Sequence, residues 1–172
     1  MTGLLVIGGA RSGKSRHAQT RCEALGKKLV YIATAEAGDA EMADRITRHR
    51  ADRGPCWETL EAPVDLCGAI AEAMTRADAV LVDCLTLWLS NLMLGGHDLP
   101  QARRQLVRTV KSARVPLVFI TNEVGMGIVP ENALARHFRD EAGWLNQEVA
   151  AAVQEVVLMV AGLPLTLKAP PG

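Results

Sequence analysis

The chain has 172 residues, of which 49% are hydrophobic, 22% are charged and 3% are aromatic. This composition is that of a folded globular protein and excludes a largely disordered chain. The 19 basic and 19 acidic residues give a formal net charge of zero, which together with the few aromatic side chains argues against a general nucleic-acid binder.

Short apolar runs alternate with helical patterns along the chain. The apolar runs predict strands at Leu4–Ile7, Lys28–Ala33, Trp57–Leu60, Ala79–Val82, Leu117–Thr121, Glu155–Val160 and Leu165–Lys168. The segments between them predict helices at Lys14–Leu25, Asp39–Asp52, Val64–Thr75, Leu85–Leu94, Leu99–Ser112 and Glu131–Ala152. Several runs are apolar at almost every position, which suits strands that helices cover on both faces. We therefore expect a single α/β domain over residues 1–172, an open and mostly parallel sheet that binds ligands at the carboxyl ends of its strands.

The first predicted strand runs directly into the glycine-rich turn Gly8-Gly9-Ala10-Arg11-Ser12-Gly13-Lys14-Ser15, which matches G-x-x-x-x-G-K-[ST]. Two of its glycines, Gly8 and Gly13, allow the backbone N–H groups to form a nest around a phosphate, and the helix that follows adds its positive N-terminal end. Lys14 is suited to reach the β- and γ-phosphates, and the Ser15 hydroxyl to ligate Mg²⁺. The turn predicts a nucleoside triphosphate site but identifies neither the base nor the reaction.

The predicted helix Asp39–Asp52 places Met42, Ile46 and His49 on one stripe, so His49 points toward the body of the protein. Two interpretations are open from the residues alone. His49 is either a partly buried core histidine beside a solvated arginine face, or a nucleophile whose neutral imidazole attacks the α-phosphorus of a nucleotide.

Asp83 directly follows the apolar run Ala79–Val82. A phosphate-loop enzyme needs such a carboxylate to hold Mg²⁺ or its water shell near the serine hydroxyl. The other interpretation is an N-cap for the predicted helix Leu85–Leu94. With the glycine-rich turn present in the same chain, the metal role is favoured.

The segment Thr121–Asn132 follows the fifth predicted strand and contains two glycines, a proline, Asn122 and Glu123. It is either a shaped binding surface at the carboxyl edge of the sheet or an ordinary connection between a strand and a helix. The residues leave both interpretations open.

The remaining signals are weak. The chain has no secretory signal pattern and no apolar run near the ~18 residues of a membrane span. No Cys-x-x-Cys pair occurs, so the cysteines are expected to be buried in a reducing compartment, and the other histidines to be structural or solvated. These residues are Cys22, Cys56, Cys67 and Cys84, and His17, His97 and His137.

Several blocks of the sequence resemble the bifunctional adenosylcobinamide kinase / adenosylcobinamide-phosphate guanylyltransferase family. The blocks are Gly8–Ala18, Tyr31–Ala35, Glu41–Arg50, Thr121–Glu131 and Leu134–Asp140. The Thr-Asn-Glu-Val-Gly-Met-Gly block and the Arg-Ile-x-x-His-Arg block are far more specific than the glycine-rich turn. The resemblance implies a RecA-like P-loop fold and a homotrimer, and the isolated cysteines predict a cytoplasmic location.

The resemblance also implies two reactions. In the first, ATP or GTP phosphorylates the aminopropanol hydroxyl of adenosylcobinamide. In the second, GMP passes from GTP to that phosphate through a guanylylated histidine, which corresponds to His49 here, with Lys14 as the second catalytic residue. The implied nucleotide contacts are Gly8, Gly9, Ala10, Arg11, Ser12, Gly13, Lys14, Ser15, Ala33, Thr34, Ala35, Arg50, Ala51, Asp52, Arg53, Glu61 and Asp83. Glu61 follows the third predicted strand, where its carboxylate could read guanine, and Ser15 and Asp83 are the expected Mg²⁺ ligands.

Two other functions compete with this one. A monofunctional P-loop kinase of small molecules needs the glycine-rich turn but no histidine intermediate. A nucleotide-operated switch or RecA-like DNA-binding module needs a basic surface, and the zero net charge argues against it.

Overall fold

The structure is a computed structural model that describes residues 3–35 and 54–170. Its strands are β1 (Gly3–Gly8), β2 (Leu29–Ala33), β3 (Trp57–Glu61), β4 (Ala79–Asp83), β5 (Leu117–Asn122), β6 (Glu155–Val160) and β7 (Leu163–Lys168). Its helices are α1 (Lys14–Glu23), α3 (Leu66–Ala73), α4 (Leu85–Leu94), α5 (Leu99–Lys111) and α6 (Ala133–Ala152).

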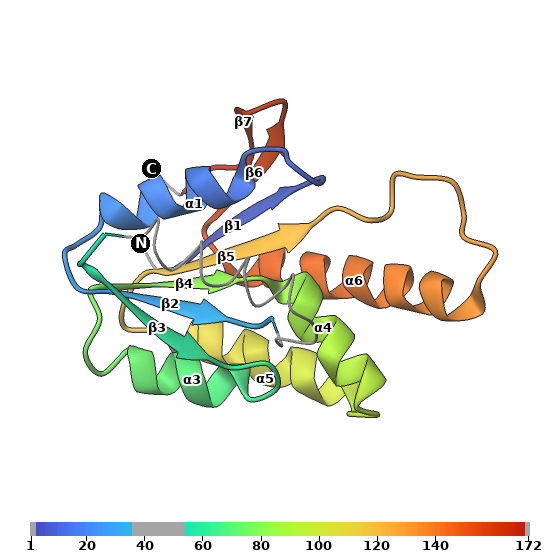
Figure 1. The fold of residues 1–172 in the computed structure, drawn as a ribbon, viewed down its shortest axis with the longest axis horizontal. Coiled ribbons are helices and arrows are strands. Elements are labelled where there is room, and N and C mark those ends of the chain that lie inside the picture. Colours follow the sequence, from blue (N-terminus) through green and yellow to red (C-terminus); the bar gives the residue numbers. More distant parts are fainter. Residues whose placement is uncertain (1–2, 36–53, 171–172) are drawn as a thin grey trace.

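The strands form one sheet in the order β3-β2-β4-β5-β1-β6-β7. Every neighbouring pair is parallel except β6 and β7, which form an antiparallel hairpin at one edge. The expected open, mostly parallel α/β sheet is therefore confirmed. Because the parallel strands point the same way, their carboxyl ends meet at one edge of the sheet (Figure 1).

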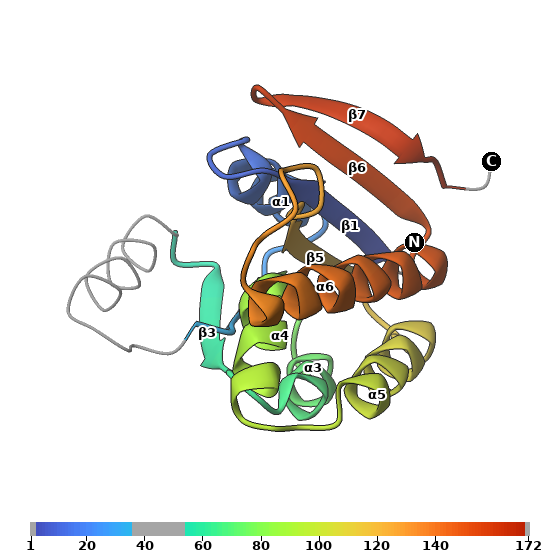
Figure 2. The same ribbon diagram turned by 90° about the vertical axis from the view of Figure 1, so that its right-hand side faces the viewer.

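Helices cover both faces of the sheet, as the continuous apolar runs of the strands predict. Helix α1 lies alone on one face among the described helices, where Ala18 and Cys22 pack onto Leu4, Val6 and other strand residues. Helices α3, α4, α5 and α6 cover the opposite face (Figures 1 and 2), and their core includes Trp88 and Phe119. This arrangement buries the middle of the sheet and leaves its carboxyl edge accessible.

Half of the boundaries of the predicted elements shift by one or two residues, and the local chemistry explains two of these shifts. The helix expected at Val64–Thr75 begins at Leu66 because the Asp65 carboxylate caps it, accepting from the Gly68 N–H. The helix expected from Glu131 begins at Ala133 because Asn132 caps it in the same way. The predicted helix 39–52 lies outside the described residues.

The four cysteines differ in how deeply they are buried. Cys22 and Cys84 are buried and Cys67 is half-buried, but Cys56 is exposed, so the expectation that all four are buried is wrong for Cys56. Burial raises the pKa of the Cys22 thiol to about 12, which makes it an inert core residue.

Within residues 3–35 and 54–170, no helix is both long and apolar enough to span a bilayer.

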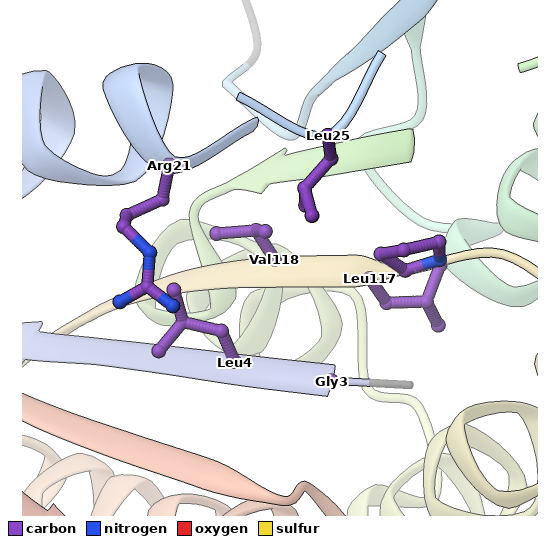
Figure 3. Close-up of a pocket in the computed structure, with 7 residues that line it drawn as sticks. Gly3, Leu4, Arg21, Leu25, Leu117 and Val118 are labelled. Atoms are coloured by element: carbon purple, nitrogen blue, oxygen red, sulfur yellow. The ribbon is translucent and has the colours of Figure 1, made fainter. Parts of the chain in front are cut away.

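A small cavity lies under the C-terminal half of α1, at the amino ends of β1 and β5 (Figure 3). Gly3, Leu4, Arg21, Leu25 and Val118 are among the residues that line it. Its volume is about 10 Å³, which is at the lower limit for holding one water molecule. It lies at the edge of the sheet opposite the glycine-rich turn and is too small for a substrate.

Candidate functional site

The glycine-rich turn joins the end of β1 to the start of α1. Gly13 precedes the helix with φ 90°, and Arg11 is also left-handed with φ 54°. The first conformation favours glycine, and the second is uncommon for a residue with a Cβ. The His17 N–H donates to the Gly13 carbonyl at 3.0 Å, which begins the helix at the turn. The turn therefore brings backbone N–H groups and the positive end of a helix to one place.

Three polar side chains of the turn, Lys14, Ser15 and Ser12, differ in their surroundings. The Lys14 Nζ donates to the Gly9 carbonyl at 3.0 Å, so the ammonium group lies over the turn. Ser15 is half-buried in the first turn of α1. The Ser12 hydroxyl is buried, and no residue of the described chain forms a hydrogen bond with it. Buried hydroxyls are ordinarily hydrogen-bonded, so an unsatisfied one inside this turn marks a polar site.

Two segments from elsewhere in the chain hold the turn in place. The Glu123 N–H donates to the Gly8 carbonyl at 3.1 Å, where β5 ends beside β1. The Gly162 N–H, in the turn between β6 and β7, donates to the Ser12 carbonyl at 3.0 Å. The glycine-rich turn is thus fixed on both sides by backbone hydrogen bonds from its neighbouring strands.

Asp83 is the last residue of β4, and the parallel register places it beside Ala33. It is half-buried, and its Oδ2 accepts a hydrogen bond from the Tyr31 hydroxyl at 3.0 Å. The alternative that Asp83 caps the following helix is wrong, because the N-cap of α4 is Cys84 and no side chain caps that helix. The Asp83 carboxylate instead remains at the carboxyl edge of the sheet.

Thr34 links the end of β2 to the end of β4. Its side chain is completely buried, and its hydroxyl donates to the Cys84 carbonyl at 2.7 Å and accepts from the Cys84 N–H at 2.8 Å. The Asn91 side-chain amide donates to the carbonyls of Thr34 (2.8 Å) and Pro63 (3.0 Å). Asn91 thereby joins the ends of β2 and β3, where Ala33, Ala35 and Glu61 lie.

Glu61 ends the edge strand β3, and the register places it beside Ala33, which itself pairs with Asp83. Glu61 is exposed, and Ala35 is half-buried. The structure therefore brings three of the sequence-predicted positions, Ala33, Glu61 and Asp83, to one edge of the sheet. The glycine-rich turn leaves β1 at the same edge.

The remaining sequence-predicted site residues lie outside the described residues. They are His49, Arg50, Ala51, Asp52 and Arg53. Of the other histidines, His97 and His137 are exposed, in agreement with a solvated role, and His17 is half-buried on α1. Burial, followed by the charge of Arg21, lowers the pKa of His17.

Two side chains at the carboxyl edge of the sheet, one on α1 and one at the end of β4, are of the types that hold the magnesium ion of a nucleotide. In the described ranges, no group of three or more His, Cys, Asp and Glu side chains could form a protein-only metal cage. Mg²⁺ commonly uses one or two protein oxygens and fills its other positions with phosphate and water. The Ser15 hydroxyl and the Asp83 carboxylate offer the oxygen ligands that this mode requires.

Sequence reasoning missed the roles of Tyr31, Asn91 and Gly162. Tyr31 stands two register positions before the residue of β2 that pairs with Asp83, so the two side chains share one face of the sheet. Only the order of the strands makes that proximity visible. Both residues of the Ala161-Gly162 hairpin turn have positive φ, and Gly162 is the one local sequence signal of such a turn.

The chain is similar along nearly its whole length to one protein family and to several named relatives. A family model described as "Cobinamide kinase / cobinamide phosphate guanyltransferase" matches residues 4–167. The "Bifunctional adenosylcobalamin biosynthesis protein CobP" of Pseudomonas aeruginosa is 44% identical over 171 residues, covering 97% of this chain and 98% of the relative. Proteins named "Bifunctional adenosylcobalamin biosynthesis protein CobU" from Salmonella typhimurium and Escherichia coli are each 43% identical, covering 96% of this chain and 99% of the relative.

The fold is also similar to that of an ATPase from the type III secretion system of pathogenic bacteria. The two superpose with a TM-score of 0.60 at 12% sequence identity. The match covers 96% of this chain but only 56% of the ATPase chain. At this identity the likeness concerns the fold alone, and it agrees with the expected P-loop architecture.

Proposed function

The chain belongs to the family of cobinamide kinases / cobinamide phosphate guanyltransferases, and from this membership we propose that it is a bifunctional transferase of cobalamin biosynthesis. It phosphorylates adenosylcobinamide with ATP or GTP and then converts the product to adenosylcobinamide-GDP with GTP. The observation that carries the proposal is the glycine-rich turn at the carboxyl edge of the sheet, with Lys14 over it and the Asp83 carboxylate at the same edge.

In the kinase step, the oxygen of the aminopropanol hydroxyl attacks the γ-phosphorus of the nucleotide. A new O–P bond forms, the bond to the β-phosphate oxygen breaks, and the hydroxyl proton leaves to water. The N–H groups of the turn and Lys14 bind the phosphate chain and offset its charge. Ser15 and Asp83 would hold Mg²⁺, which when bound neutralises charge on the β- and γ-phosphates.

In the guanylyl step, an imidazole nitrogen of His49 attacks the α-phosphorus of GTP. A P–N bond forms and pyrophosphate leaves. A phosphate oxygen of adenosylcobinamide phosphate then attacks the same phosphorus, the P–N bond breaks and the imidazole is free again. His49 takes this role through the resemblance of its Arg-Ile-x-x-His-Arg block to the family.

The other nucleotide contacts complete the proposal. Ala33 and Ala35 border the base at the end of β2, where Thr34 and Asn91 fix the backbone. Glu61 accepts hydrogen bonds from the N1–H and 2-amino group of guanine, and Arg50–Arg53 bind the same nucleotide. We further propose that residues 1–172 act as one nucleotide-binding domain, that the enzyme is cytoplasmic, where ATP and GTP are available, and that it is a homotrimer.

Labelling with α-³²P-GTP tests this proposal. We expect the wild-type protein to retain label that is stable to base and released by acid, as a phosphoramidate is. Label that is absent from the wild type, or that survives acid, would contradict the histidine intermediate. Phosphorylation of cobinamide without any protein label would favour the monofunctional kinase instead.

Two variants separate the two steps. His49→Ala is expected to abolish labelling and retain phosphorylation of adenosylcobinamide. Lys14→Ala is expected to lower both activities by ~10²-fold or more, because we propose that the same turn binds the triphosphate in both steps. Retention of full labelling in His49→Ala would show that another residue carries the nucleotide.

A further inference from the structure

The β5–α6 loop, residues 123–132, is fixed at both of its ends. At its start, the Glu123 N–H donates to the Gly8 carbonyl at 3.1 Å, and the Glu123 Oε1 accepts from the Gly125 N–H at 2.5 Å. At its end, the Arg136 guanidinium donates to the carbonyls of Pro130 (2.9 Å) and Glu131 (2.6 Å). The loop therefore has a defined position relative to the glycine-rich turn.

Between these fixed ends the loop presents large apolar side chains to solvent. Ile128 is 98% exposed and Met126 is 80% exposed. Val129, Val124 and Leu134, the last in the first turn of α6, are also exposed. A patch of exposed apolar side chains with polar residues around it often marks a surface that binds another molecule. Of the described loops at the carboxyl edge, this one carries the most exposed apolar side chains.

The loop lies at the same end of the molecule as the turn that holds the phosphates. Gly8 and Asn122 are register partners, so β1 and β5 end side by side, one entering the glycine-rich turn and the other entering the loop. Figure 1 shows the loop extending beyond this edge of the sheet. A bulky molecule whose hydroxyl reaches a bound γ-phosphate must rest its remaining surface on a neighbouring segment of the same edge.

We propose that the β5–α6 loop binds the corrin macrocycle of the acceptor through Val124, Met126, Ile128 and Val129, and this inference rests on the proposed function. A corrin is a broad, largely apolar ring edged with methyl groups and carboxamides, so it matches an apolar surface much wider than a nucleotide needs. Met126 adapts its shape to such a surface, and Gly127, around whose Cβ position no atom lies within 4 Å, leaves the nearby backbone accessible to the carboxamides. The loop is thus the acceptor side of the site, and the glycine-rich turn is the donor side.

The double variant Met126→Ser/Ile128→Ser tests this inference without removing a core residue. We expect its KM for adenosylcobinamide to rise about tenfold, while labelling by α-³²P-GTP stays at the wild-type level because that reaction uses no corrinoid. Equilibrium dialysis with dicyanocobinamide, measured by its absorbance, should show the same loss of affinity without turnover. Leu94→Ser is the matched control, since Leu94 is 74% exposed at the far end of α4.

The possible results separate the two proposals. A wild-type protein that neither binds dicyanocobinamide nor phosphorylates adenosylcobinamide overturns the proposed function. A wild type that does both, with unchanged corrinoid affinity in the double variant, overturns the role of the loop alone. Light scattering supplies the last outcome: if the double variant changes the mass of the assembly, the loop is a contact between copies of the chain and the inference is wrong.

Discussion

Gly8 and Gly9 are adjacent in the glycine-rich turn but differ in their surroundings. A Cβ on Gly8 would lie 2.6 Å from the Ser12 Oγ and 2.8 Å from the Met159 carbonyl oxygen. A Cβ on Gly9 would have no atom within 4 Å. The pattern that identifies the turn requires glycine at position 8 but accepts any residue at position 9, and the packing of Gly8 against β6 is the physical reason for that difference.

This difference predicts the effect of single methyl groups on stability. Gly8→Ala is expected to lower the free energy of unfolding by about 1–3 kcal/mol, because the backbone of Met159 cannot move aside cheaply. Gly9→Ala is expected to stay within about 0.5 kcal/mol of the wild type. Urea denaturation of the three proteins measures both values, and equal stability of the two variants would contradict the packing argument.

At the scale of elements, α1 is attached to the sheet at both ends. Its start is the glycine-rich turn, and near its other end Arg21 makes a two-pronged ion pair with Glu155 on β6, with distances of 2.8 and 2.6 Å. The hydrogen bonds from Arg21 hold the pKa of Glu155 below its usual range. The pair fixes the helix that carries Lys14 and Ser15.

The ion pair predicts a pH dependence of stability. Because the pKa of Glu155 is lower in the folded than in the unfolded protein, the pair stabilises the fold above the unfolded pKa near 4.5. That contribution is lost as the pH falls through the folded-state pKa. Glu155→Gln is expected to lower the free energy of unfolding at pH 7 by about 1–2 kcal/mol. On acidification, the variant should lose less of its free energy of unfolding than the wild type does.

Denaturant titrations between pH 7 and pH 3 measure this dependence. The matched control is Glu58→Gln, which breaks the solvent-exposed pair between Glu58 and Arg76. Exposed pairs contribute little, so this variant should follow the wild-type profile more closely. A Glu155→Gln profile parallel to that of the wild type at every pH would contradict the assignment.

At the scale of the whole molecule, the sheet ends in an exposed edge. The residues Leu163, Leu165 and Leu167 of β7 alternate along the strand, and each is more than half exposed. Exposed apolar edge strands tend to pair with another chain unless something covers them. In the proposed homotrimer, β7 is therefore the surface that we expect to meet a second copy.

Light scattering tests this expectation. The wild-type mass should be three times the 18.5 kDa of the chain, and Leu165→Lys should lower it toward that of one chain. Leu94→Lys, at an exposed position outside the sheet, should leave the mass unchanged. A monomeric wild type would contradict the homotrimer, and an intact trimer in Leu165→Lys would exclude β7 as its contact.

The sequence by itself determined the features that neighbouring residues create. The glycine spacing predicted the turn before Lys14 and the apolar runs located the strands, because each depends on interactions within a few residues. The caps Asp65 and Asn132 are equally local, although the predicted helices began two residues before the observed starts. Only the tertiary structure decided that β5 lies beside β1, so that Glu123 meets Gly8, and that β2 lies beside β4, so that Tyr31 meets Asp83. Strand order arises from pairing between distant segments, and local patterns carry no record of which segments will pair.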